Sequence, residues 1–136
     1  MPLALLDTDI LSELLKLRNL SVRHKALAYT QQHGQITISA MTRYEIIRGY
    51  KDQNATTQLA RFATFCQNSV VLPITDAILD RASDLWTFAN QNGHPRGDAD
   101  LIIAATALEH GHVLVTGNTA HFAWIPGLAT EDWRQP

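Results

Sequence analysis

The stretch Leu3-Ala4-Leu5-Leu6-Asp7-Thr8-Asp9 decides the fold, because it joins a short apolar run directly to two carboxylates. A short, continuous apolar run is typical of a buried strand in a parallel sheet. About ninety residues later, Gly97-Asp98-Ala99-Asp100 opens the apolar stretch 101–105. Ligands of α/β proteins bind outside the carboxyl ends of parallel strands, and acids gathered there repel one another unless a cation joins them. The pattern predicts an oxygen-rich site for Mg²⁺ or Mn²⁺ and chemistry on phosphate.

The rest of the chain alternates between strand and helix signals. Apolar runs and period-two patterns predict further strands at 35–39, 70–72 and 113–116. Helical spacing predicts helices at 10–17, 26–33, 39–49, 59–66, 75–89 and 99–110, the third beginning at Ser39 or Thr42 and the last closed by Gly111. Leu17 and Trp86 are expected on the apolar stripes of their helices. Strands alternating with helices predict an α/β fold with a central parallel sheet covered on both faces.

The composition narrows the class of protein. The chain has 136 residues, 46% of them hydrophobic and 18% charged, which predicts one globular domain over 1–136 with a substantial core. The net charge of −2 argues against a general basic tail for nucleic acid, so such binding would need a local patch or a bound cation. Cys66 is the single cysteine, which excludes an intramolecular disulfide and a cysteine-based zinc cluster. No signal peptide or membrane span is recognisable, so a cytoplasmic protein is expected.

Asp7, Glu45, Asp100 and Asn118 are the candidate site residues. Asp7 follows the first predicted strand and Asn118 follows the last, while Asp100 opens a helix and Glu45 lies about one turn into another. The competing structural interpretations are local. Thr42-x-x-Glu45 matches a capping box, and Asp9, Asp98 or Asp100 could each be a helix N-cap. We favour the functional interpretation because several helix starts rarely converge on one edge of a sheet for capping alone.

Basic residues near these acids are candidate contacts for a phosphate. His94 and Arg96 lie in the loop before Asp98, and Arg43 precedes Glu45 by two positions. Each of the three could contact RNA or simply be solvated. Cys66 falls on an apolar stripe and is expected in the core.

These residues are similar to those of the PIN-domain ribonucleases, and within them to the VapC toxins of bacterial toxin–antitoxin pairs. The resemblance covers nearly the whole chain, and its motifs occur in order: Leu5-Leu6-Asp7-Thr8-Asp9-Ile10-Leu11-Ser12, Ser39-x-x-Thr42-x-x-Glu45, Gly93-x-Pro95-x-Gly97-x-x-Asp100-x-x-Ile103-Ala104-Ala105, Leu114-Val115-Thr116-x-Asn118, and Phe122-x-x-Ile125-Pro126-Gly127-Leu128-x-x-Glu131-Asp132-Trp133.

The resemblance implies a three-layer α/β/α sandwich and a catalytic set of Asp7, Glu45, Asp100 and Asn118. The three acids would bind Mg²⁺ or Mn²⁺. It also implies cleavage of single-stranded segments of RNA, a homodimer, and inhibition by a VapB-like antitoxin in a hetero-oligomer. The ending of the chain is similar to that of the subgroup that cleaves initiator tRNA in the anticodon loop.

The chain departs from the family pattern at two positions, and a further acid accompanies them. Many PIN domains carry an acid where Asn118 stands, although this toxin subgroup often has asparagine, and one charge fewer would weaken a second metal site. Asp9 stands where asparagine is usual, and Asp98 is an additional acid. We expect Asp9, Asp98, Thr8 and Thr116 to assist from outside the metal-binding set.

Two other functions compete with the ribonuclease. An aspartate-nucleophile phosphatase or a phospho-receiver domain would use Leu6-Asp7-x-Asp9 but needs a lysine late in the chain, and no lysine follows Lys51. A catalytically inactive PIN-like binding module would be expected to have lost acids from the set, which is intact here except at Asn118.

Overall fold

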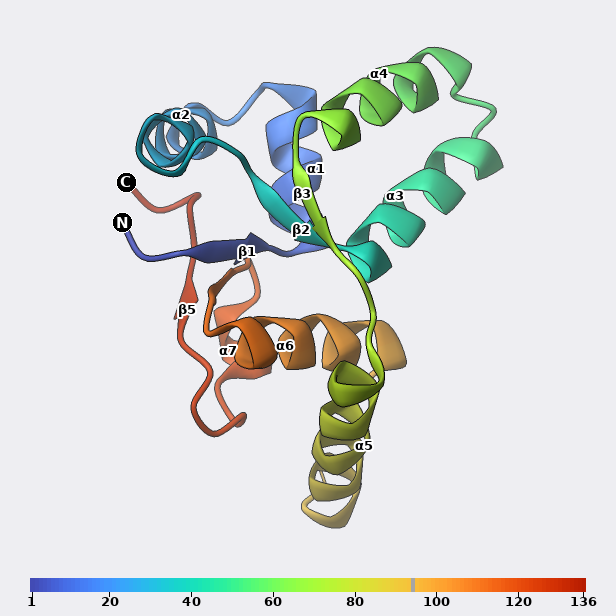
Figure 1. The fold of residues 1–136 in the computed structure, drawn as a ribbon, viewed down its shortest axis with the longest axis vertical. Coiled ribbons are helices and arrows are strands. Elements are labelled where there is room, and N and C mark those ends of the chain that lie inside the picture. Colours follow the sequence, from blue (N-terminus) through green and yellow to red (C-terminus); the bar gives the residue numbers. More distant parts are fainter. Residues whose placement is uncertain (94) are drawn as a thin grey trace.

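A five-stranded parallel sheet forms the centre of the computed structural model, which describes residues 1–93 and 95–136 (Figure 1). The strands are ordered β3-β2-β1-β4-β5 across the sheet. Leu6 of β1 pairs with Ile38 of β2 on one side and with Val115 of β4 on the other. The carboxyl ends of these central strands therefore lie together. The strands are β1 (Ala4–Leu6), β2 (Thr37–Ser39), β3 (Val70–Leu72), β4 (Val113–Val115) and β5 (Thr130–Glu131).

Helices cover both faces of the sheet (Figure 1). Side chains alternate along β1, so that Leu6 packs with one helical layer while Leu5 packs with the other. The core around Leu6 contains residues of α1 to α4, and the core around Leu5 contains residues of α5 to α7. The predicted three-layer α/β/α sandwich is thus confirmed. The helices are α1 (Thr8–Lys16), α2 (Leu20–His33), α3 (Ala40–Asp52), α4 (Thr56–Gln67), α5 (Asp76–Gln91), α6 (Asp98–His110) and α7 (Thr119–Phe122).

Polar residues at the strand ends start the helices that flank the site. Asp7 is the N-cap of α1, and its side chain accepts a hydrogen bond from the Thr8 amide. Ser39 is the N-cap of α3 and accepts from the Met41 amide. Asp7 directly follows β1, and Ser39 is the last residue of β2. The change from strand to helix therefore happens at the edge where the candidate site lies.

Several boundaries differ from those predicted. Helix α2 begins at Leu20 rather than Ala26, because Asn19 caps it and accepts from the Val22 amide. Helix α3 runs through Gly49 to Asp52. Leu17 and Trp86 are 60% and 49% exposed, so the apolar stripes predicted for their helices are not buried at these two positions. Leu17 leaves the stripe because it is the left-handed C-cap of α1.

The sequence did not predict α7 or β5. Helix α7 is four residues long, and β5 is a two-residue edge strand of polar composition. Neither carries a hydrophobic period long enough to signal an element. Within the described part of the chain, none of the helices has both the length and the apolar character needed to cross a membrane.

Candidate active site

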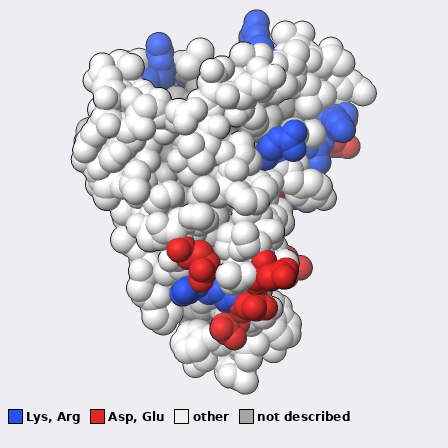
Figure 2. Space-filling model, viewed as in Figure 1, with Lys and Arg blue, Asp and Glu red and all other residues white. Residues whose placement is uncertain are grey.

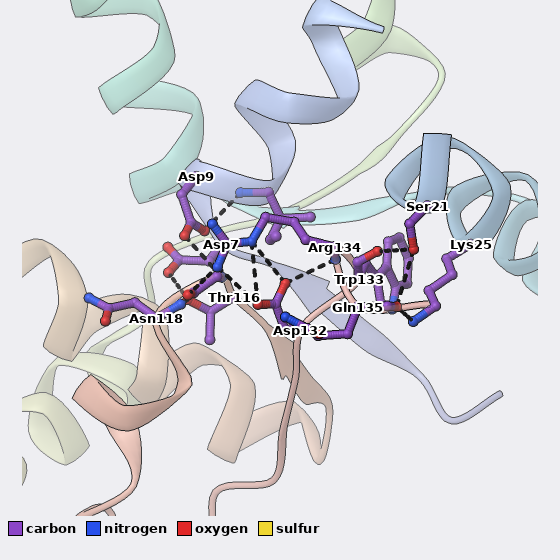
Figure 3. Close-up of polar contacts among 12 residues, drawn as sticks. Asp7, Asp9, Ser21, Lys25, Thr116, Asn118, Asp132, Trp133, Arg134 and Gln135 are labelled. Carbon is purple, nitrogen blue, oxygen red and sulfur yellow. Dashed lines mark hydrogen bonds and ion pairs between the residues drawn. The ribbon is translucent and has the colours of Figure 1, made fainter. Parts of the chain in front are cut away.

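Asp7 is the most buried acid of the candidate site. It directly follows β1 and is 7% exposed. Its Oδ1 accepts from the Thr8 amide at 2.7 Å, and its Oδ2 accepts from the Thr116 hydroxyl at 2.9 Å. Thr116 follows β4 and is fully buried, so the neighbouring strand fixes the carboxylate (Figure 3). Asp7 is therefore held in one orientation by groups from two strand ends.

The surroundings of Asp7 disfavour its negative charge. Burial, and after it the negative charges of Asp9 and Asp100, raise the pKa of Asp7 from 3.8 to about 6. The hydrogen bonds from Thr116 and Thr8 oppose this shift without cancelling it. A carboxylate crowded by other carboxylates is a typical place for a divalent cation, because the cation removes the repulsion.

Asp9 connects the start of α1 to the loop after β4. Its Oδ1 accepts from the Ile10 amide at 2.7 Å, and its Oδ2 accepts from the Gly117 amide at 2.9 Å. Burial raises its pKa, while these two hydrogen bonds oppose the change. The cap of α1 is Asp7, so the interpretation of Asp9 as that N-cap was wrong. Asp9 instead holds the loop that carries Asn118.

Arg134 holds the same loop from the other side. Its Nη2 donates to the Gly117 carbonyl at 2.6 Å and to Asp132 Oδ2 at 2.9 Å. The buried Trp133 anchors this tail in the core against Tyr29, with ring centroids 5.7 Å apart. Figure 3 shows the resulting chain of contacts from Asp132 through Arg134 toward Asp7 and Asp9. Arg134 was not predicted, because a single arginine near a terminus belongs to no periodic pattern or motif.

Replacing Gly117 with alanine should disturb this loop. An added Cβ would lie 2.6 Å from Arg134 Cζ and 2.7 Å from Asp9 Oδ2, so both side chains would have to move. We expect Gly117→Ala to lower the catalytic rate by about 10-fold or more, since a misplacement of about 1 Å near a reacting centre can reduce a rate 100-fold. Single-turnover rates measure the effect.

Gly49→Ala is the matched control for this substitution. Gly49 lies inside α3, and an added Cβ would meet nothing within 4 Å. We expect this variant to keep its activity and to gain about 0.5–1 kcal/mol in unfolding free energy. Equal activity of the Gly117→Ala and wild-type proteins would show that the loop position does not matter.

Glu45 faces the start of α1. Its Oε1 accepts from Thr8 Oγ1 at 2.8 Å, and the same hydroxyl lies 3.1 Å from Thr42 Oγ1. Ser39, not Thr42, caps α3. The capping-box interpretation of Glu45 was therefore wrong, and its carboxylate is free of any role at the helix end. Its Oε2 lies 3.7 Å from Arg48, one turn further along the helix.

Asp100 lies in the first turn of α6. The N-cap of that helix is Gly97, which makes no side-chain hydrogen bond there, so neither Asp98 nor Asp100 is the cap. Asp100 Oδ2 instead lies 2.9 Å from His121 Nε2 in α7, a contact that the sequence did not predict. Asp98 borders a groove of about 510 Å³ between α5 and α6, together with Trp86 and Leu101.

Asn118 stands at the N-cap position of α7, and its side chain makes no capping hydrogen bond. The backbone amide of Asn118 donates to Thr116 Oγ1 at 3.1 Å, and the same threonine hydroxyl donates to Asp7. The Asn118 side chain is drawn beside Thr116 in Figure 3. The loop after β4 thus connects Asn118 to Asp7 through one shared threonine.

The predicted phosphate contacts have different surroundings. Arg96 donates to the His121 carbonyl at 3.3 Å and lies over the Trp124 ring. Arg43 is exposed on α3 and lies beside Cys66, where it opposes the rise that burial causes in the pKa of that thiol. Cys66 is half-buried and packs against the core. His94 lies outside the described residues.

The acids do not form a closed metal site in this structure. Within residues 1–93 and 95–136, no three His, Cys, Asp or Glu side chains are grouped closely enough to hold an ion. The donor chemistry nevertheless fits a hard divalent cation, because Asp7, Glu45 and Asp100 offer carboxylate oxygens and no positive charge among the described residues lowers the pKa of Asp7. Glu45 and Asp100 each have one oxygen bound by a neighbouring side chain.

Comparison with known families decides the relationship. The model of the PIN domain family matches residues 4–127 of this chain.

The chain belongs to the PIN-domain family.

Individual relatives place it more narrowly. It is 32% identical over 130 residues to the tRNA(fMet)-specific endonuclease VapC of Shigella flexneri, covering 95% of this chain and 96% of that protein. Its fold is similar to a chain of the DNA-bound VapBC structure from Salmonella typhimurium, with a TM-score of 0.85, 28% identity and coverage of 98% and 99% of the two chains. The VapBC-1 structure from nontypeable Haemophilus influenzae gives a TM-score of 0.81 at 27% identity, with coverage of 98% and 99%.

The predicted membership of the PIN-domain family, and within it of the VapC ribonucleases, is confirmed. It replaces the alternatives of an aspartate-nucleophile phosphatase and a receiver domain. Two residues outside the predicted set lie beside the site: His121 contacts Asp100, and Arg134 contacts Gly117 in the loop that carries Asn118. The roles of the individual acids stay predictions.

Proposed function

We propose that this protein is a Mg²⁺- or Mn²⁺-dependent endoribonuclease, a single PIN domain over 1–136, that acts as the toxin of a toxin–antitoxin pair. The observation that carries the metal dependence is the burial of Asp7 at the carboxyl end of β1, with Asp9 and Asp100 raising its pKa. Ionised Asp7 is unfavourable there without a cation. The match to VapC ribonucleases over nearly the whole chain supports RNA as the substrate.

Asp7, Glu45 and Asp100 would hold the ion, with Asn118 offering an amide oxygen or holding a water. A bound divalent ion eases deprotonation of a water and stabilises negative charge on a phosphate. The protein's own groups fix the geometry beforehand: Thr116 and the Thr8 amide orient Asp7, and the Thr8 hydroxyl orients Glu45. Thr8 thus contacts both Asp7 and Glu45, which favours a site whose geometry is set before the ion binds.

Contacts with RNA are best supplied by α3. On the face shown in Figure 2, Lys and Arg side chains gather over α3, while Asp and Glu side chains gather over α5 and α6. Arg43, Arg48 and Lys51 are exposed residues of α3, the helix that carries Glu45. We therefore place the RNA backbone along α3, with Arg96 as a second contact. Unpaired loop bases are the proposed target, because sequence-specific recognition of RNA by proteins mostly uses single-stranded loops.

The most specific substrate proposal is initiator tRNA, cut in its anticodon loop. It rests on the similarity to the endonuclease from Shigella flexneri, whose name specifies tRNA(fMet).

The proposed partner is a VapB-like antitoxin, in a cytoplasmic hetero-oligomer that also contains a toxin homodimer. The relatives of known structure include toxin–antitoxin complexes. An apolar groove of about 670 Å³ between α1, α2 and α4 supports a protein partner. Leu17, Leu20 and Leu27 line it and are 60%, 62% and 59% exposed, which is unusual for a cluster of leucines on a protein without partners.

Cleavage of labelled tRNA by the purified protein tests the proposal. We expect Mg²⁺ or Mn²⁺ to produce a single cut in the anticodon loop of initiator tRNA and much slower cleavage of elongator methionine tRNA. Excess EDTA should abolish the cut, and added Mg²⁺ should restore it. Equal cleavage of both tRNAs would contradict the substrate, and EDTA-resistant cleavage would contradict the metal. A protein that binds RNA without cutting it would favour the inactive binding module.

A further inference from the structure

We propose that His121 is a positioning residue, which holds the Asp100 carboxylate in the orientation that binds the divalent ion. This inference rests on the proposed function and deepens it. His121 belongs to no predicted motif, and it reaches the candidate site from α7, the short helix after β4.

The contact between the two side chains is direct. His121 Nε2 lies 2.9 Å from Asp100 Oδ2, and the two side chains are 29% and 40% exposed. Because an ionised carboxylate only accepts hydrogen bonds, Nε2 carries the hydrogen and donates it. Oδ2 is thereby bound to the imidazole. Oδ1 has no described hydrogen bond and is the oxygen that is left for a cation.

His121 is itself held in place by its neighbours. Its amide donates to the Asn118 carbonyl at 3.0 Å, and its carbonyl accepts from Arg96 Nε at 3.3 Å. Its ring meets the Phe122 ring edge to face, with centroids 5.3 Å apart. The imidazole therefore connects the loop after β4, which carries Asn118, to the start of α6, which carries Asp100. A histidine fixed on both sides can orient a partner.

The position of the pair argues against an ordinary surface ion pair. Asp100 is close enough to Asp7 for its charge to act on that buried carboxylate. Exposed ion pairs contribute little to stability, whereas groups that hydrogen-bond a metal-ligating side chain are typically worth 10–100-fold in metal affinity. The two roles therefore predict different measurements.

Direct binding of the ion by His121 is the main alternative role. In this structure Nε2 faces the Asp100 oxygen, and one nitrogen cannot donate a hydrogen to the carboxylate and bind a cation at once. Positioning therefore agrees with the contact as it stands, while ligation would need the ring to turn away.

Manganese binding tests the proposal without RNA. Free Mn²⁺ is measured by electron paramagnetic resonance during titration of the wild-type, His121→Ala, His121→Gln and Asp7→Asn proteins, with His24→Ala, an exposed histidine of α2, as the control. We expect His121→Ala to weaken Mn²⁺ binding by about 10–100-fold. His121→Gln should restore most of the affinity, because its amide N–H can replace Nε2 as donor. His24→Ala should match the wild type, and metal-free melting temperatures should show that all variants are folded.

Three results would overturn the inference. The first is unchanged Mn²⁺ affinity in folded His121→Ala, and the second is a His121→Gln affinity as low as that of His121→Ala. The third is an electron spin echo signal from a nitrogen bound to Mn²⁺ that disappears in His121→Ala, which would make the histidine a ligand. If the wild type binds no Mn²⁺, the proposed function fails and this inference fails with it. That outcome differs from binding that is merely insensitive to His121.

Discussion

Asp7→Asn should reduce metal-dependent RNA cleavage by at least about 100-fold, since even the groups that support a metal ligand are worth 10–100-fold. The substitution changes charge with little change in shape. The asparagine oxygen can still accept from the Thr8 amide, and its amide group can donate to Thr116 Oγ1, so both contacts of Asp7 have a replacement. The loss would therefore report the missing negative charge. Single-turnover cleavage of end-labelled initiator tRNA in Mg²⁺ measures it.

Two further variants make this result specific. Asp100→Asn should show a loss of similar size, because it removes a second carboxylate of the proposed set. Asp80→Asn changes an exposed aspartate of α5, outside the helix proposed to contact RNA, and should keep wild-type activity. Near-wild-type cleavage by folded Asp7→Asn would remove the central assumption of the proposed mechanism. A reduced rate in all three variants would instead point to general electrostatics.

Sequence reasoning located the acids because each accompanies an apolar run. Asp7 follows β1 directly and Asp100 lies in the first turn of the apolar helix α6, so a change in pattern marks both positions. Parallel pairing then brings strand ends from distant parts of the chain to one edge. The same reasoning predicted the sheet and the helices on both faces, which follow from alternation of strand and helix signals alone.

Contacts made by isolated polar residues lay beyond the reach of the sequence. His121 and Arg134 sit in short, irregular segments, and their partners are decided by how those segments pack rather than by spacing. Glu45 shows a second limit. Thr42-x-x-Glu45 is an equally good capping box, and only the end of β2 at Ser39 decides which residue caps α3. The local sequence pattern alone therefore does not show which residue caps α3, because that depends on where β2 ends in the sheet.

The metal-free protein should become less stable as the pH rises from about 4 to 6, and Asp7→Asn should remove most of this loss. The pKa of Asp7 is about 6 in the folded protein, against 3.8 for an ordinary aspartate, so the folded state holds this proton more tightly than the unfolded chain. The stabilisation is therefore complete below pH 3.8 and is lost as the pH rises through the folded pKa. At pH 7 the difference amounts to about 3 kcal/mol in favour of Asp7→Asn, from 1.36 kcal/mol per pKa unit.

Other groups titrate in the same range, so the comparison must be between variants. Burial raises the pKa of Asp9, which adds to the loss of stability with rising pH. Burial lowers the pKa of His112, which has the opposite effect as the pH rises toward 6.5. Subtracting the wild-type curve from the Asp7→Asn curve cancels most of both contributions. Asp132 affects stability only at lower pH, because the hydrogen bond from Arg134 holds its pKa below 3.8.

Urea unfolding in EDTA at pH 4, 5, 6 and 7, at one protein concentration, measures the difference. The two proteins should have similar unfolding free energies at pH 4, and the variant should be the more stable one at pH 7. Excess Mg²⁺ at pH 7 should then stabilise the wild type more than the variant, because only the wild type keeps the full set of acids. If the unfolding free energies of the two proteins changed equally from pH 4 to 7, ionisation of Asp7 would not destabilise the folded protein. In that case the protein would have no electrostatic need for a cation at this position, and the argument for metal dependence would lose its physical basis.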